Sequence, residues 1–187
     1  MKKQKKQKQK KIKAVMLDPP WNEQGGGKIK RGADRHYPLM KTKDIIEYVK
    51  KNVNPYLDTN CHIYLWVTNN FLADGLKVLE ECGFRYITCL TWTKDKFGLG
   101  YYFRGQTEQC LFAVKGKLPP QSKSVSTSIT AIRTKHSKKP EEIYAVIQSV
   151  SPPPYAEVFA RTERKGWAAI GNEVSNGSFG YHKSLNK

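Results

Sequence analysis

The chain has 187 residues and a formal net charge of +17, from 33 Lys and Arg residues against 16 Asp and Glu residues. This length suits one domain with a sizeable core, and a hydrophobic fraction of 39% excludes a wholly disordered chain. No apolar run approaches the roughly 18 to 20 residues of a membrane-spanning helix, so we expect no membrane partner. The charge indicates a polyanionic partner, and nucleic acid is the working hypothesis.

The first predicted segment is a disordered basic tail over residues 1–12, in which Lys and Gln alternate. It buries too little apolar surface to fold alone, and no apolar stretch follows it, so it is not a signal peptide. A solubilising tail is the alternative to contact with a polyanion. We expect one folded domain over residues 13–174 and a C-terminal tail over residues 175–187.

The body alternates short apolar runs with helical periodicity, which is typical of an α/β domain. A buried strand is predicted over residues 14–17 and a helix over residues 43–51, with Thr42 as its N-cap. The nearly continuous apolar run 61–67 predicts a second strand.

The next helix is expected to begin at an Asn cap, Asn69 or Asn70, and to end at Gly83. Its periodicity predicts that three leucines face the core: Leu72, Leu76 and Leu79.

The second half of the body repeats the alternation of strands and helices. It predicts strands over 86–93, 109–114 and 156–160, a mobile polar loop over 117–139, and a helix over 140–150. Because the strands are apolar without alternation, we predict a mainly parallel sheet covered by helices on both faces. Three tryptophans are expected in the core: Trp66, Trp92 and Trp167.

Cysteines and histidines are scattered through the body without the spacing of a metal site or of a disulfide framework. We therefore predict no metal, and reduced, buried thiols in a cytoplasmic protein. The cysteines are Cys61, Cys82, Cys89 and Cys110.

The sharpest feature is the sequence Asp18-Pro19-Pro20-Trp21, which directly follows the first strand. Ligands of open α/β sheets bind at the carboxyl ends of strands, where this turn would lie. The two prolines make the turn stiff and leave its carbonyls free to accept hydrogen bonds. An acidic residue, two acceptor carbonyls and an aromatic face suit a flat base that carries an amino group. The alternative is that the prolines only end the strand and Trp21 packs in the core.

The substrate chemistry favours a methyl transfer. The exocyclic amino nitrogen of adenine is a poor nucleophile because its lone pair is delocalised into the ring. Asp18 and the Pro19 carbonyl could hold both of its hydrogens while Trp21 or Tyr37 stacks on the base. The electrophile would be the methyl group of S-adenosylmethionine, whose positive sulfonium centre the Asp18 carboxylate attracts.

Several blocks in the same order resemble the MT-A70-like family of N6-adenine methyltransferases. Besides DPPW they are the Gly-Ala-x-x-His-Tyr-Pro segment at 32–38, YLWVTN at 64–69, WTKDKFGLGYYFR at 92–104, EQCLFAVKGK at 108–117, HSKKPEEIY at 136–144, EVFAR and GWAAIGNE. The resemblance runs from about Ile12 to Val174. It implies a Rossmann-like class I methyltransferase domain with a circularly permuted motif order, in which the catalytic motif comes before the cofactor-binding elements.

The same resemblance implies which residues bind S-adenosylmethionine. Besides Asp18, they are Lys139 of the Lys-Pro pair, Arg161 after the last core strand, Asn172 of the closing Gly-Asn-Glu and Glu173 beside it.

Two of these assignments have alternatives from the residues alone. A Lys at a helix N-terminus is unfavourable for the helix dipole, so Lys139 should face an anion such as the cofactor carboxylate. It could instead be one of several solvated loop lysines, and Arg161 could pair with Glu163 or Glu157. The chain also departs from other methyltransferases, because EVFART has no glycine for a close backbone approach to the cofactor.

The resemblance also places Tyr37 at the target adenine. No separate target-recognition domain is visible, so the basic loops at 22–43, 95–106 and 117–139 must contact the nucleic acid. Lys28, Arg31 and Arg104 are the candidate contacts, together with Trp21.

We therefore expect an S-adenosylmethionine-dependent N6-adenine methyltransferase, and we favour DNA over RNA, with the target base flipped out of the duplex. RNA N6-adenosine methylation and a non-catalytic nucleic-acid-binding subunit are the alternatives. Whether the chain forms a homodimer or a heterodimer stays open.

Overall fold

The computed structural model describes residues 11–23, 38–98, 102–132 and 138–171. Within them, seven strands form one sheet in the order β5-β3-β4-β2-β1-β6-β7. The strands are β1 (Ile12–Leu17), β2 (Leu57–Val67), β3 (Arg85–Thr93), β4 (Thr107–Lys115), β5 (Ser128–Thr130), β6 (Tyr155–Val158) and β7 (Trp167–Ile170). The helices are α1 (Thr42–Asn52), α2 (Leu72–Glu81), α3 (Glu142–Val150) and the 3-10 turns η2 (Asn54–Tyr56) and η3 (Asn69–Phe71).

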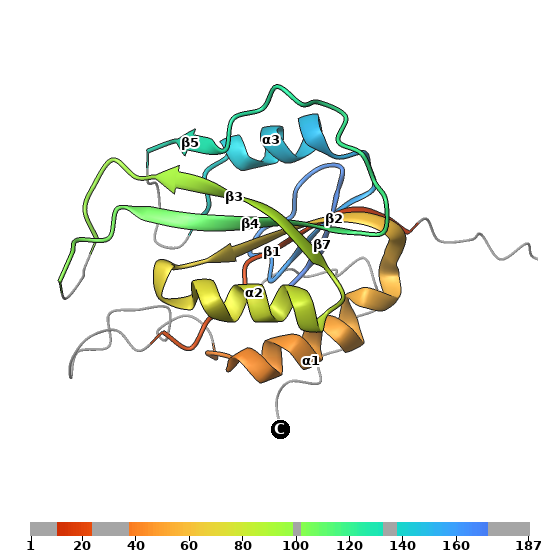
Figure 1. Cartoon of the computed structure of the whole chain (residues 1–187), viewed down its shortest axis with the longest axis horizontal. Helices are drawn as coiled ribbons and strands as arrows, with labels where there is room; N and C mark the ends of the chain where they lie inside the picture. The colour runs from red at the N-terminus through yellow and green to blue at the C-terminus, as the bar shows by residue number, and fades with distance from the viewer. Residues whose placement is uncertain (1–10, 24–37, 99–101, 133–137, 172–187) are drawn as a thin grey trace, which may run out of the picture.

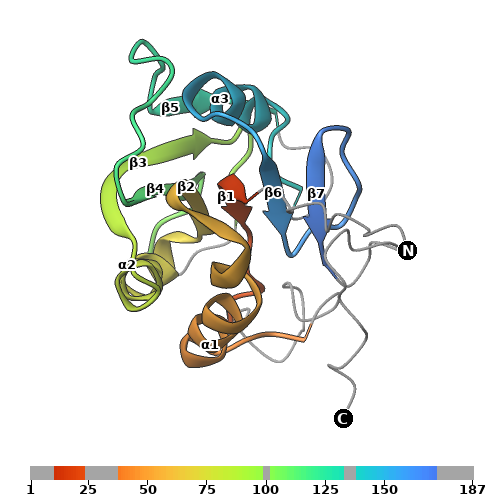
Figure 2. The ribbon, with the colours of Figure 1, turned by 90° about the vertical axis from the view of Figure 1, so that its right-hand side faces the viewer.

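Helices cover both faces of the sheet, as the strand pattern predicts. α1 and α2 lie on one face and α3 on the other (Figures 1 and 2). Each face has its own apolar core, and the core on the α3 side contains the three tryptophans predicted to be buried. No helix among the described residues combines the length and the apolar character that a bilayer crossing requires.

The sheet is mainly parallel, and β4 is the exception. β1 pairs in parallel with β2 and β6, β6 with β7, and β3 with β5. β4 runs antiparallel to both of its neighbours, β2 and β3. The reason is local: the described residues between β3 and β4, 94–98 and 102–106, form no helix. The chain turns back directly on itself, which antiparallel strands allow and parallel strands do not.

The helix α2 is rotated from the predicted orientation. Leu79 is buried as expected, but Leu72 and Leu76 are 40% and 39% exposed. The buried face instead carries Gly75, where an added Cβ would lie only 2.6 Å from Cγ1 of Val67. The helix therefore packs against the sheet through its glycine, and this turns the two leucines outward.

Polar residues predicted to cap helices serve other contacts. Thr42 is the first residue of α1, and its hydroxyl donates to Oδ1 of Asp74 at 2.5 Å. Asn69 and Asn70 lie in η3 before α2, which has no side-chain cap. Gly83 ends α2 with a φ of +81°, as predicted.

Two predicted boundaries also change. Ile12, assigned to the basic tail, is the buried first residue of β1. The segment predicted as a loop over 117–139 contains β5, which extends the sheet beyond β3. The domain limits at 174 and 175 lie outside the described residues.

Candidate active site

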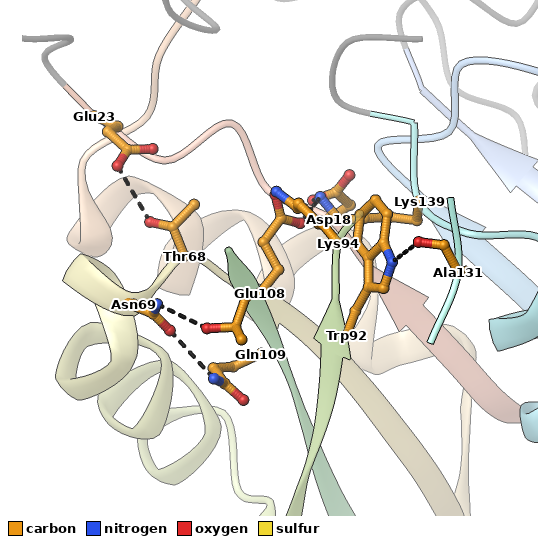
Figure 3. A network of polar contacts seen from close by, with 11 residues as sticks. Asp18, Glu23, Thr68, Asn69, Trp92, Lys94, Glu108, Gln109, Ala131 and Lys139 are labelled. Atoms are coloured by element: carbon orange, nitrogen blue, oxygen red, sulfur yellow. Dashed lines mark hydrogen bonds and ion pairs between the residues drawn. The ribbon is translucent and has the colours of Figure 1, made fainter. Parts of the chain in front are cut away.

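Four charged side chains meet at one end of the sheet, where β1 and β3 end and the antiparallel β4 begins. Nζ of Lys139 lies 2.9 Å from Oδ1 of Asp18 and 3.2 Å from Oε2 of Glu108. Nζ of Lys94 lies 2.5 Å from the other Glu108 oxygen. We call Asp18, Lys139, Glu108 and Lys94 the active-site ion cluster; Figure 3 shows how they converge from separate segments.

Lys139 is the centre of this cluster. Its side chain is 12% exposed, and its ammonium lies 5.3 Å from the centroid of the Trp66 ring. Electrostatic attraction is stronger in such a partly buried site than at the surface, and the face of an indole attracts a cation. The anion that Lys139 faces is therefore supplied by the protein itself, which overturns the alternative of a solvated loop lysine.

The two carboxylates of the cluster differ in their electrostatics. Burial raises the pKa of Asp18 above its ordinary value, although Lys139 opposes this. Burial also favours a higher pKa for Glu108, but the ammonium groups of Lys139 and Lys94 outweigh it and lower the pKa. Glu108 is thus the firmly ionised partner, whereas Asp18 is the carboxylate that can more readily take up a proton.

The carbonyls of the Asp18-Pro19-Pro20-Trp21 turn are not free, contrary to the sequence prediction. Pro19 O accepts the N–H of Trp21 at 2.9 Å, and Pro20 O accepts the N–H of Met40 at 2.8 Å. Since a carbonyl oxygen has two lone pairs, each can accept one further hydrogen bond. The turn is therefore stiffened by its own backbone as well as by its prolines.

Trp21 packs in the core, so the structure does not favour its predicted role as a base-stacking platform. Its side chain is 5% exposed, and its Nε1 donates to the Trp66 carbonyl at 2.9 Å. Its ring stacks on Phe71, with the ring centroids 5.4 Å apart. The ring thus fastens the turn to the end of β2.

A second contact fastens the same turn. Oε1 of Glu23 accepts a hydrogen bond from Thr68 Oγ1 at 3.5 Å, immediately after β2 (Figure 3). The same oxygen accepts a hydrogen bond from Asn70 Nδ2 at 3.1 Å. Two contacts therefore attach the chain that follows Asp18 to the segment at the end of β2.

The turn after β6 lies next to Asp18, whose N–H donates to Val158 O at 3.4 Å. Phe159 has a φ of +64°, a left-handed conformation that glycine adopts without strain and a bulky residue does not. The sequence EVFART thus takes a glycine-like turn without a glycine. Arg161, two residues later, is half-buried, and its charge acts on Asp18 by lowering its pKa.

The structure brings three of the predicted site residues together: Asp18, Lys139 and Arg161. Arg104 is exposed on the connection between β3 and β4. The remaining predicted residues, Tyr37, Lys28, Arg31, Asn172 and Glu173, lie outside the described residues.

Glu108 and Lys94 were not assigned from the sequence. The sequence feature that could have identified them is a charged residue at the end of one apolar strand and another at the start of the next. Because such strands pair as neighbours, opposite charges at their joined ends can meet.

Comparison with known proteins identifies the family of the chain. A family model described as MT-A70 matches residues 12–173. The chain belongs to the MT-A70 family. The resemblance seen in the sequence is confirmed, and S-adenosylmethionine is the methyl donor of this family.

Several curated relatives carry methyltransferase names. The chain is 28% identical over 173 residues to the N(6)-adenosine-methyltransferase MT-A70-like of Arabidopsis thaliana, covering 86% of this chain and 23% of that protein. It is 29% identical over 191 residues to the type II methyltransferase M.MunI of Mycoplasma sp, covering 88% and 78%. It is 25% identical over 176 residues to the catalytic subunit METTL3 of Homo sapiens, covering 88% and 28%. The chain thus spans about a quarter of the length of these plant and human relatives.

The residues of the ion cluster fit the methyl donor of the MT-A70 family. S-adenosylmethionine carries a positive sulfonium, an amino-acid carboxylate and polar groups on its nucleoside. Asp18 offers a carboxylate to a cation, and Lys139 offers an ammonium to a carboxylate. The Trp66 ring lies beside Lys139, and its Nε1 is buried without a hydrogen-bond partner among the described residues.

Proposed function

We propose that this chain is an S-adenosylmethionine-dependent N6-adenine methyltransferase that acts on DNA. The observation that carries the proposal is the ion pair between Asp18 and Lys139 at the carboxyl end of β1. This pair supports the proposal because a carboxylate that could accept a proton and a cation that could bind an anionic ligand share one partly buried site.

In this proposal Lys139 binds the cofactor and Asp18 acts on the target base. When bound, S-adenosylmethionine would supply the methyl group to N6 as its methyl–sulfur bond breaks, and it would leave as a neutral thioether. Lys139 would bind the amino-acid carboxylate of the cofactor with Arg161 nearby, and Glu108 and Lys94 would keep the Lys139 ammonium in place. This arrangement frees Asp18 from part of its ion pair.

Asp18 would then act on the target base. Its carboxylate accepts a hydrogen bond from the N6 amino group, and the remaining lone pair of Pro19 O accepts the other. Methylation makes this nitrogen more acidic, so a proton leaves it, and the raised pKa of Asp18 suits the carboxylate oxygen as acceptor. Tyr37, rather than the buried Trp21, is our candidate for stacking on the adenine.

We favour DNA because the chain matches most of the length of one relative, the type II methyltransferase M.MunI. M.MunI, named a type II methyltransferase, is matched over 78% of its length, whereas the plant and human relatives are matched over only 23% and 28% of theirs. RNA N6-adenosine methylation is the second candidate, because the plant and animal relatives are named N(6)-adenosine-methyltransferases.

A direct competition separates these two substrates. The full chain would be incubated with labelled S-adenosylmethionine and matched oligonucleotides that differ only in deoxyribose or ribose at every position, both single-stranded and duplex. We expect higher kcat/KM on DNA. Higher kcat/KM on RNA would replace DNA by RNA in the proposal, and no transfer to either would support a non-catalytic subunit.

A further inference from the structure

The connection between β3 and β4 presents three aromatic rings to solvent. Tyr102 is 88% exposed, Phe103 89% and Phe97 70%. Among the described residues only Ile132, at 73%, is a comparably exposed large apolar residue, and the others are near 40%. Single exposed apolar residues are ordinary, but several large ones gathered together mark a contact surface.

Backbone contacts fix the base of this connection. The Lys94 N–H donates to Gln106 O, and the Gln106 side-chain amide donates to Lys94 O, both at 2.9 Å. Farther out, the Gly98 N–H donates to Gly105 O at 2.6 Å, and an added Cβ on Gly98 would lie 2.9 Å from that oxygen. The two segments therefore extend the β3–β4 pairing beyond the sheet as a hairpin (Figure 1).

The hairpin begins at the rim of the candidate active site. Lys94, at its base, belongs to the active-site ion cluster and pairs with Glu108. An extended residue advances about 3.3 Å, so Phe97 lies at most about 10 Å of chain from Lys94. Ile132 lies at the same end, because Thr130 of β5 pairs with Thr93 of β3.

The charges around the aromatic rings indicate the kind of partner. Lys96 and Arg104 flank the rings and are exposed, and neither lies within ion-pair distance of a carboxylate in the described chain; Asp95 is the opposing charge nearby. Aromatic faces beside cations suit a polyanion that also presents flat rings, which describes nucleic-acid bases on their phosphate backbone. A second copy of this chain would bring the same positive charges to the contact.

We propose that Phe97, Tyr102 and Phe103 form a stacking surface for bases of the nucleic acid next to the target adenine. The inference rests on the proposed function, which makes a nucleic acid the substrate. Moving the adenine out of the stack leaves its neighbours exposed, and aromatic side chains stack on exposed bases whatever their identity. The hairpin then binds the flanking bases while Asp18 contacts the target.

The test uses the full chain and oligonucleotides that carry 2-aminopurine beside the adenine. The fluorescence of 2-aminopurine reports whether it is stacked. The double variant Tyr102→Leu/Phe103→Leu keeps apolar side chains and removes the aromatic faces. We expect its Kd for the oligonucleotide to rise about tenfold or more, the size of effect that losing base–aromatic stacking causes. Binding of S-adenosylmethionine and the melting temperature should be unchanged, and Phe103→Trp should bind as wild type. Leu76→Ala, an exposed apolar site on α2, is the matched control.

Unchanged oligonucleotide affinity in the double variant would overturn the proposal. So would sedimentation showing that wild type self-associates and that the double variant only loses this association, because the hairpin would then be a protein contact. The proposed function is tested separately by methyl transfer. If binding depends on Phe103 but no methyl group is transferred, the stacking surface is supported and the proposed enzyme activity is refuted. If methyl transfer occurs but the double variant binds as wild type, the activity is supported and the stacking surface is refuted.

Discussion

Replacing Glu108 by Gln is the sharpest perturbation of the active-site ion cluster. The substitution keeps the shape of the side chain and removes the negative charge between two lysines. Nζ of Lys139 and Nζ of Lys94 each contact a different oxygen of Glu108, at 3.2 and 2.5 Å. The amide oxygen of Gln can serve only one of them, because its NH2 group would face the other ammonium as a second donor.

The expected cost follows from this mismatch. A hydrogen bond to a charged group contributes about 1.5–3 kcal/mol, and these side chains are only 12 to 17% exposed, so solvent offers little compensation. We expect the free energy of unfolding to fall by about 2–3 kcal/mol. For a domain of this size that corresponds to a loss of about 4–12 °C in Tm.

The same variant should change the pH dependence of methyl transfer. The Glu108 carboxylate raises the pKa of Asp18, so its removal lowers that pKa. In the proposed mechanism, transfer requires Asp18 as a carboxylate, and the acidic limb of the pH–rate profile should therefore move to lower pH. The assay is initial transfer rate across buffers, together with thermal and urea denaturation.

Glu81→Gln is the matched control, because Glu81 pairs with Lys50 at 3.0 Å on the surface, with both side chains nearly half exposed. It should leave both stability and the pH profile unchanged. Equal effects of the two substitutions on stability, or an acidic limb that stays in place in Glu108→Gln, would refute the reasoning.

Three further predictions concern the scaffold. Leu79→Ala should cost about 2–5 kcal/mol of stability, whereas Leu76→Ala should change it by less than about 0.5 kcal/mol; equal losses in denaturation experiments would contradict the observed rotation of α2. Gly171→Ala should cost about 1–3 kcal/mol, because its Cβ would lie 2.0 Å from the Ala160 carbonyl oxygen, and a wild-type Tm would show that this turn yields easily. Burial lowers the pKa of His62 below 6.5. Its contribution to the free energy of unfolding is therefore full above about pH 6.5 and is lost as the pH falls through the lower pKa of the folded state. A difference in unfolding free energy between wild type and His62→Gln that stays constant from pH 7.5 to 5 would contradict this.

The position of Asp18 at the end of β1 could be predicted because local sequence determines it. An apolar strand followed at once by Asp18 and two prolines places the carboxylate at the end of a sheet strand, and this placement does not depend on the strand order. Lys139 was also predicted, partly because a lysine beside a helix N-terminus requires an anion. The anion in the structure is Asp18 itself together with Glu108.

The environment of the site could not be predicted in the same way, because it depends on contacts between distant segments. The position of Glu108 beside Lys139 depends on the strand order β3-β4-β2-β1, and residues within each strand do not reveal that order. The burial of Trp21 depends on Phe71 and on the Trp66 carbonyl, both about 45 to 50 positions away. The exposure of Leu72 and Leu76 follows from the close packing of Gly75 on the sheet.

The central claim is that Asp18 and Lys139 form the site of methyl transfer to N6 of adenine. The most direct test incubates adenine-containing DNA with S-adenosylmethionine and analyses the nucleosides by mass spectrometry. Wild type, Asp18→Asn and Lys139→Met are compared at a temperature at which all three are folded. We predict N6-methyldeoxyadenosine with wild type, none above background with Asp18→Asn, and a raised KM for the cofactor with Lys139→Met. Undiminished N6-methyldeoxyadenosine from Asp18→Asn, or a methyl group on another atom, would contradict the claim.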